Sequence, residues 1–349
     1  MSILTTCIGA YPKPEYIDIG NFAETEHQTD AKTREFTYTQ DDADQVPETL
    51  LVRATREVIE DQINCGIDIP TDGEQRRENY IHYHCRNLEG IDFQTLTSKV
   101  HRNGAAVADL PSITGRILPR GNHFLDRDFK IAQEHSEKPI KITVPGPLSI
   151  IDTTANLFYT EERDLAFDLA DALNFEIRAL ADAGCQYIQV DEPLFVRKVD
   201  QALEYGVECL DRCFDGLDDS VIRVMHMCCG YPGHVDDEDY LKADPDCYFK
   251  LARKVDASSV HQVSIEDAHC LNQLSLLEEF SQTSIILGAI KIASSQIEST
   301  EEIEQRLQMA LRHIDRERLL AAPDCGLMML GRDLAMKKLQ NMCEAAQSV

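Results

Sequence analysis

A histidine and a cysteine separated by one residue, His226 and Cys228, form the most chemically specific pattern in this sequence. They lie at the end of a β-forming run, residues 221–227, and residues i and i+2 of a strand point to the same face. A histidine nitrogen and a cysteine sulfur are then directed toward one point, and zinc binds both. The alternative interpretation is a buried histidine beside a structural cysteine, with Cys229 packing on the opposite face.

Two more residues of ligand type follow other β-forming runs. Glu266 comes directly after residues 260–265, and Cys325 comes shortly after residues 319–323. One nitrogen, one oxygen and two sulfur donors suit a tetrahedral zinc ion. The sequence therefore predicts a Zn²⁺ site formed by His226, Cys228, Glu266 and Cys325.

Acidic residues follow two further runs. Glu74 lies in an Asp-Gly-Glu turn after residues 67–71, and Asp191 and Glu192 follow residues 187–190. One interpretation is that these carboxylates cap the helices that come next. The functional interpretation is that Glu74 and Asp191 face one pocket and bind a substrate that carries an amino group.

The elements that would position these residues recur along the whole chain. Eight β-forming runs are expected, at residues 4–9, 67–71, 140–144, 187–190, 221–227, 260–265, 285–292 and 319–323. Helical stretches are expected at 48–65, 161–183, 303–314 and 332–346, and Ser299 with Glu302 forms a capping box before the third. Eight strand–helix units predict an α/β fold, a TIM (β/α)8 barrel, with the active site at the carboxyl ends of the strands.

One segment interrupts this alternation. Residues 92–137 are expected to form an excursion between the second and third strands, and Asn103-Gly104 is typical of a hairpin turn. We expect this excursion to belong to a single catalytic domain that spans residues 1–349.

Composition excludes several classes of function. The net charge of −27 argues against nucleic acid and anionic membranes as partners. No apolar run is long enough to cross a membrane, and the first residues do not resemble a signal peptide. A cytoplasmic protein is therefore expected, with most of the 12 cysteines reduced.

Several stretches together resemble a known family. The sequences IQVDEP (188–193), HMC (226–228), SIE (264–266) and PDCGL (323–327) are similar to the C-terminal catalytic barrel of cobalamin-independent methionine synthases, and they occur in the same order. The resemblance implies a member of the methionine synthase and uroporphyrinogen decarboxylase-like superfamily. It implies that His226, Cys228, Glu266 and Cys325 bind zinc and that Glu74 and Asp191 bind the amino group of homocysteine.

The activity implied is that of a 5-methyltetrahydropteroyltriglutamate-homocysteine S-methyltransferase, in which a zinc-activated thiolate attacks a methyl donor and gives methionine. The sequence departs from the family on the donor side, because Thr153 and Ala293 stand where a tryptophan and a histidine are usual. In the first loop, Ala10 replaces a serine that helps to hold the carboxylate of the substrate. The small thiol and the zinc set are thus better supported than a folate donor.

Three other functions compete with this one. The first is a zinc-dependent alkyltransferase that acts on another small thiol, as epoxyalkane:coenzyme M transferases do. The second is a metal-free decarboxylase that resembles uroporphyrinogen decarboxylase, and the predicted zinc ligands argue against it. The third is a non-catalytic zinc-binding barrel, whose metal would be enclosed by four protein ligands and would not exchange one for substrate.

Overall fold

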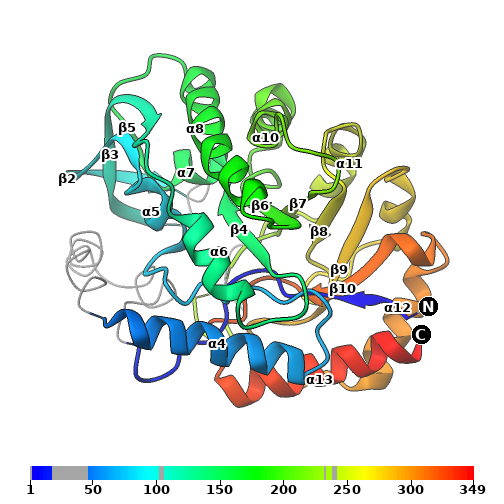
Figure 1. Ribbon diagram of the computed structural model, residues 1–349. Helices are drawn as coiled ribbons and strands as arrows, with labels where there is room; N and C mark the ends of the chain where they lie inside the picture. The colour runs from blue at the N-terminus through cyan, green and yellow to red at the C-terminus, as the bar shows by residue number, and fades with distance from the viewer. Residues whose placement is uncertain (1, 18–45, 102–105, 232, 238–241) are drawn as a thin grey trace.

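Seven parallel strands form one sheet in the computed structural model, which describes residues 2–17, 46–101, 106–231, 233–237 and 242–349. They lie side by side in the order β1, β10, β9, β8, β7, β6, β4 (Figure 1). Their bounds are β1 Leu4–Thr5, β4 Lys141–Pro145, β6 Tyr187–Asp191, β7 Ile222–Met227, β8 Gln262–Ile265, β9 Ser284–Ile290 and β10 Leu319–Pro323. The prediction of a mixed α/β fold with a parallel sheet is confirmed.

The second predicted strand, residues 67–71, is reduced to two isolated parallel bridges. The bridges join Thr6 to Ile69 and Thr71 to Lys141. Pro70 lacks the N–H group that a continuous ladder would use, and the N–H of Thr71 donates instead to Oε1 of Gln62 at 2.9 Å. The segment therefore lies between β1 and β4 without forming a regular strand.

The four predicted helices are confirmed as α4 Glu48–Asn64, α8 Glu162–Asp182, α12 Thr300–Ala310 and α13 Arg332–Ser348. The capping box is present, because Ser299 and Glu302 each accept a hydrogen bond from the backbone N–H of the other. Further helices are α6 Leu125–Gln133, α10 Val207–Cys213 and α11 Cys247–Asp256, and shorter ones are α5 Tyr80–Cys85, α7 Pro147–Asp152 and α9 Val199–Gln201. The long helices lie around the outside of the sheet (Figure 1).

A long antiparallel hairpin accounts for most of the predicted excursion. Strands β2 Leu88–His101 and β3 Ala106–Pro119 pair along their length, and β5 Ala155–Asn156 adds to β3 in parallel. The hairpin begins a few residues before the expected boundary, and the turn predicted at Asn103-Gly104 lies outside the described residues. Lys99 connects the hairpin to the end of α7, since its Nζ donates to the carbonyl oxygens of Ile151 and Thr154 at 2.6 and 2.8 Å.

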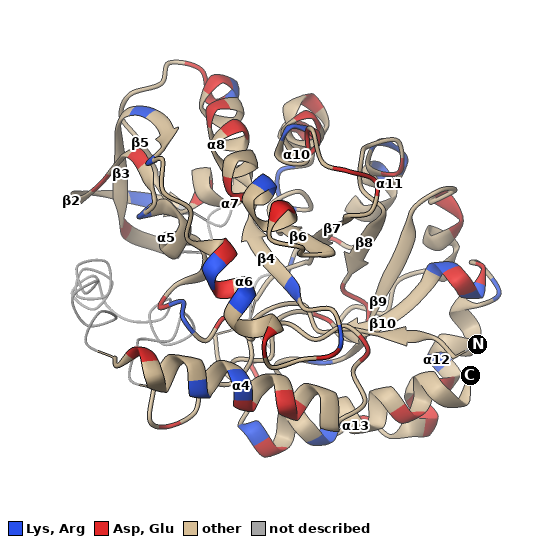
Figure 2. Ribbon diagram, viewed as in Figure 1, with Lys and Arg blue, Asp and Glu red and all other residues tan. Residues whose placement is uncertain are grey.

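Apolar side chains fill both faces of the sheet. A large cluster packs between the strands and the helices, and a smaller inner cluster contains Ile8, Ile69, Val224, Ile286, Leu320 and Ala322. Both acidic and basic residues lie on the outer helices (Figure 2), and acidic residues are the more numerous in the whole sequence. Among the described residues, no helix combines the length and the apolar character that a membrane span requires.

Candidate metal and substrate site

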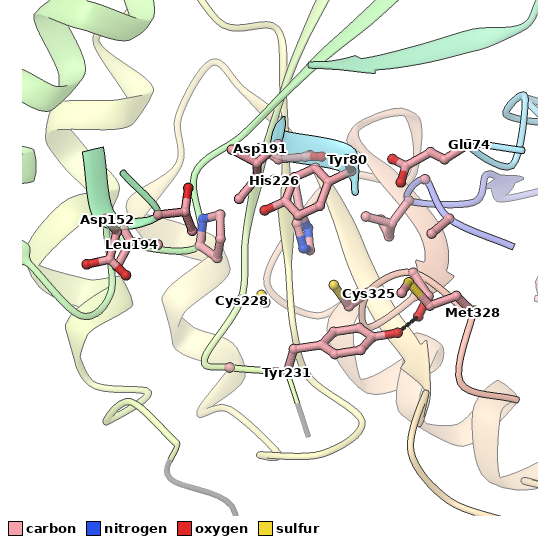
Figure 3. A pocket seen from close by; sticks show the side chains of 18 of the residues that line it. Glu74, Tyr80, Asp152, Asp191, Leu194, His226, Cys228, Tyr231, Cys325 and Met328 are labelled. Carbon is pink, nitrogen blue, oxygen red and sulfur yellow. Dashed lines mark hydrogen bonds between the residues drawn. The ribbon is translucent and has the colours of Figure 1, made fainter. Parts of the chain in front are cut away.

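Residues from β6, β7 and β10 meet at the carboxyl ends of the strands, where they line one cavity (Figure 3). Asp191 is the last residue of β6 and pairs in register with His226 of β7. Cys228 directly follows β7, and Cys325 follows β10 by two residues. All four line the cavity together with Glu74, so residues that are far apart in the sequence converge as predicted.

Three of the predicted metal ligands form a compact group. The ligand atoms of His226, Cys228 and Cys325 lie within 4.8 Å of one another. Nδ1 of His226 is 3.0 Å from Oγ of Ser264, while Nε2 is buried and has no hydrogen-bond partner among the described residues. A ring held through one nitrogen, with the other left without a partner, is the usual arrangement of a metal-binding histidine. The residues present therefore fit a soft divalent cation such as zinc.

Glu266 lies outside this compact group. Its Oε2 accepts the N–H of Cys229 at 2.8 Å, and its Oε1 forms an ion pair with Nζ of Lys242 at 2.9 Å. Its carboxylate is grouped instead with His269 and Asp324. A fourth bond from Glu266 to a metal thus stays a prediction, and forming it would require the carboxylate to leave these partners.

Asp324 fixes the position of its neighbour Cys325, a candidate ligand. Its carboxylate accepts the N–H groups of Asp267, Ala268 and His269 at 2.9, 2.9 and 2.7 Å, and Nδ1 of His269 lies 2.6 Å from it. These bonds join the end of β10 to the loop after β8. Gly288 leaves room for this contact, because a Cβ atom there would overlap Oδ1 of Asp324.

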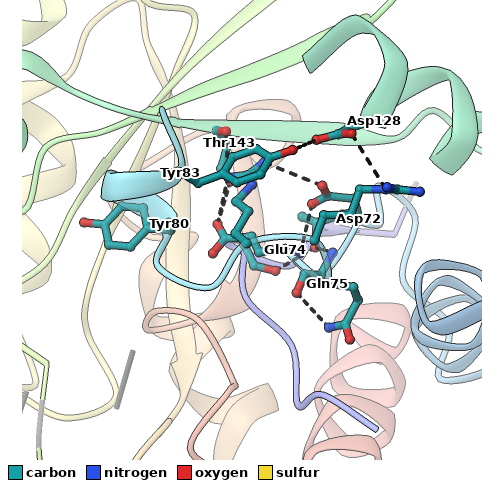
Figure 4. Close-up of polar contacts among 12 residues, drawn as sticks. Asp72, Glu74, Gln75, Tyr80, Tyr83, Asp128 and Thr143 are labelled. Atoms are coloured by element: carbon teal, nitrogen blue, oxygen red, sulfur yellow. Dashed lines mark hydrogen bonds and ion pairs between the residues drawn. The ribbon is translucent and has the colours of Figure 1, made fainter. Parts of the chain in front are cut away.

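Glu74 is held in a strained turn at the edge of the cavity. Gly73 and Glu74 have φ angles of 65° and 55°, a region that residues other than glycine seldom adopt. Thr143 donates to Oε1 of Glu74 at 2.6 Å, and NH1 of Arg77 lies 3.4 Å from the same atom (Figure 4). Arg77 also donates to the carbonyl and hydroxyl oxygens of Thr143. Such strain at a cavity is typical of a functional residue.

Within the part of the chain that the structure describes, no basic side chain is bonded to Asp191. Its Oδ1 accepts the amide of Gln189 at 2.7 Å, and that amide also donates to the carbonyl of Ile8. Burial raises the pKa of Asp191 to about 6, although nearby His226 lowers it. Burial also raises the pKa of Glu74, against the effect of Arg77. A positively charged ligand group would lower the pKa of both carboxylates and favour their charged forms.

Glu192 serves a structural role, but it caps α7, which precedes it in the chain, and not the following segment that the capping interpretation named. Its buried carboxylate accepts the N–H groups of Leu148 and Ser149 at 2.9 and 3.2 Å, in the first turn of α7. Burial raises its pKa to about 8. Helix α7 leads to Thr153, which lines the cavity, whereas Ala293 is buried and is not among the described lining residues.

Sequence reasoning missed the residues that support this site. Arg77, Thr143, Ser264 and Asp324 act through partners that lie far away in the sequence. Tyr231 was also missed, although it lines the cavity and its hydroxyl donates to the carbonyl of Gly326 at 3.1 Å. Two signals were available, since Thr143 and Ser264 lie on inward-facing positions of predicted strands, and Ser264 and Asp324 belong to the stretches SIE and PDCGL that carry the family resemblance.

A parallel sheet with nitrogen and sulfur donors at its carboxyl edge defines an α/β protein with a candidate metal centre. The model of the family described as "Cobalamin-independent synthase, Catalytic domain" matches residues 3–348, and the chain belongs to this family.

Named relatives agree with this membership. A methionine synthase of Sulfolobus acidocaldarius is 30% identical over 97% of this chain and 89% of its own length. A methionine synthase of Saccharolobus solfataricus is 29% identical over 99% of this chain and 94% of its own length. Among solved structures, a B12-independent methionine synthase from a Shewanella species, in complex with selenomethionine, superposes with a TM-score of 0.84 at 27% identity and covers 100% of this chain and 98% of that chain. The Listeria monocytogenes protein described as a putative B12-independent methionine synthase shares the fold, with a TM-score of 0.69 at 19% identity over 99% and 98% of the two chains.

Proposed function

We propose that this chain is a zinc-dependent methyltransferase that transfers a methyl group to the sulfur of homocysteine and so forms methionine. The observation that carries the proposal is the juxtaposition, in one cavity, of a nitrogen and sulfur donor group with two buried carboxylates. The names of the relatives and the selenomethionine in the Shewanella structure support the same reaction.

His226, Cys228 and Cys325 would hold the zinc ion, and Glu266 would be the fourth ligand. A bound zinc ion lowers the pKa of a thiol so that it is a thiolate at neutral pH. The chain's own residues orient the substrate. Glu74 and Asp191 bind the ammonium group, and the hydrogen bonds of Thr143 and Gln189 fix their carboxylates.

The carboxylates favour an amino thiol over the other small thiols. Coenzyme M carries a sulfonate, and a negative charge beside Glu74 and Asp191 would be repelled. An ammonium group would instead gain two charge-assisted hydrogen bonds. A purely structural zinc site would not need carboxylates that bind a substrate, so Glu74 and Asp191 favour a catalytic site.

We also propose a closed barrel and a single domain. We propose that the bridges at Ile69 and Thr71 close the seven strands into a (β/α)8 barrel, since they join the outermost strands β1 and β4. The hairpin β2–β3 is then an insertion in a single domain that spans the chain, and Lys99 connects it to the cavity wall.

The test is a comparison of two cysteine variants. We expect purified protein to hold about one zinc ion per chain and to form methionine from homocysteine and 5-methyltetrahydropteroyltriglutamate. Cys325→Ser should lose zinc and activity together. Cys185→Ser is the control, because Cys185 is more deeply buried than the half-buried Cys325 and bonds the backbone carbonyls of Ile140 and Tyr187, away from the candidate ligands. Full activity in Cys325→Ser, or wild-type protein that is active without zinc, would contradict the proposal.

A further inference from the structure

A second, smaller cavity adjoins the main one behind Glu74. The two cavities share Ala10, Glu74, Tyr80 and Met328 as lining residues. Lys13 and Arg77 line only the smaller cavity. The substrate site therefore continues past Glu74 into a space lined by these two basic side chains and by Glu78, whose carboxylate is paired with Arg86.

Lys13 supplies a positive charge in this space, close enough to Glu74 and Glu78 to feel their charges, and among the described residues no carboxylate is bonded to it. Its Nζ donates to the carbonyl oxygens of Glu74 and Arg77, both at 3.0 Å. An ammonium group carries three N–H donors, so one donor remains for a ligand. Burial lowers the pKa of Lys13 to about 8, and the side chain stays charged at neutral pH.

The two arginines that line the cavities are bonded to other groups. The guanidinium of Arg77 is bonded to Thr143 and Glu74. Arg197 donates to the carbonyl of Cys229 at 3.2 Å and follows Leu194, which lies across the cavity from Glu74 (Figure 3).

The chemistry of an amino acid places its carboxylate beside its amino group, because both are bonded to the same carbon. If the ammonium group lies at Glu74 and Asp191, the carboxylate must lie next to them and away from the sulfur donors. The smaller cavity offers such a place. Ala10, which lines both cavities, contributes only a methyl group.

We propose that Lys13 binds the α-carboxylate of the thiol substrate and thereby selects an amino acid over a simple amino thiol. This inference rests on the proposed function, because it assumes that homocysteine binds in the main cavity. Lys13 also holds the backbone of the strained Glu74 turn through its two carbonyl contacts, so the test must separate recognition from support.

The experiment compares two thiols by titration calorimetry on zinc-loaded protein. The probes are homocysteine and 3-aminopropanethiol, which is homocysteine without its carboxylate. Lys13→Met should weaken homocysteine binding by about tenfold to a hundredfold, the range for one hydrogen bond between charged groups. It should leave the affinity for 3-aminopropanethiol unchanged within about twofold, and Lys13→Arg should restore part of the discrimination.

The matched control is Lys99→Met, which removes another partly buried ammonium that donates to two backbone carbonyls. This control should keep the wild-type ratio of the two affinities. An equal loss for both thiols in Lys13→Met would show that Lys13 only supports the turn and would overturn the inference. Unchanged binding of homocysteine would place the carboxylate elsewhere and would also overturn it. If wild-type protein binds neither thiol, the proposed function itself fails.

Discussion

Replacing Lys141 with methionine is expected to stabilise the folded protein. Lys141 lies on β4, and its side chain is 1% exposed. Its Nζ has no hydrogen-bond partner among the described residues. It pairs in register with Tyr187, which packs against the inner cluster, so its side chain points to the inner side of the sheet, where the charge of Asp191 acts on it. A buried ammonium without a partner is costly, and methionine keeps nearly the same shape without the charge.

The size of the expected stabilisation by Lys141→Met follows from the pKa of this lysine. Burial lowers it from the usual 10.5 to about 8, although Cys7 and Asp191 act in the opposite direction. The unfolded chain therefore holds the proton more tightly than the folded protein. At 1.36 kcal/mol per pH unit, the charged lysine destabilises the fold by about 3 kcal/mol at pH 7. Wild-type stability should rise as the pH passes from 8 to 10.5, so the advantage of Lys141→Met should shrink over that window.

The assay is urea unfolding followed by far-UV circular dichroism, because the chain contains no tryptophan. Wild-type protein and Lys141→Met are compared at pH 7 and pH 10, and effects of other titrating groups cancel in the difference. A variant that is less stable than wild type at pH 7 would refute the reasoning. An advantage of equal size at both pH values would show that charge is not its cause.

Three substitutions test the residues that hold the side chains of the site in position. Thr143→Val removes a donor to Glu74 and should raise the KM for homocysteine about tenfold, with zinc content unchanged, as steady-state kinetics and metal analysis would show. Ser264→Ala frees Nδ1 of His226 and should weaken zinc about tenfold in a chelator competition. Gly146→Ala places a methyl group against the carboxylate that caps α7 and should lower unfolding stability by about 1–3 kcal/mol in urea.

Local patterns were sufficient to predict much of this protein. The parallel strands, the long helices and the capping box at Ser299 follow from periodicity and end signals, which act over a few residues. The strand-end rule then located His226, Cys228 and Cys325 at one edge, and the structure brings their ligand atoms together.

What the sequence did not show depends on distant partners. Pro70 and the side chain of Gln62 reduce the second strand to bridges, and only the folded chain places that side chain there. The partners of Glu266 are likewise set by tertiary structure, since Lys242 competes for its carboxylate. Nothing in the sequence distinguishes Lys13 from an ordinary surface lysine. Its position beside Glu74 depends on the fold, which places the first loop against the turn at Gly73 and Glu74.

The most direct test of the central claim is zinc-edge X-ray absorption on zinc-loaded protein before and after homocysteine is added. A substrate thiol that reaches the metal should raise the number of sulfur neighbours by about one, and homoserine, with oxygen in place of sulfur, should leave the spectrum unchanged. A sulfur count that does not change at saturating homocysteine would contradict the account and would leave a closed, structural zinc site.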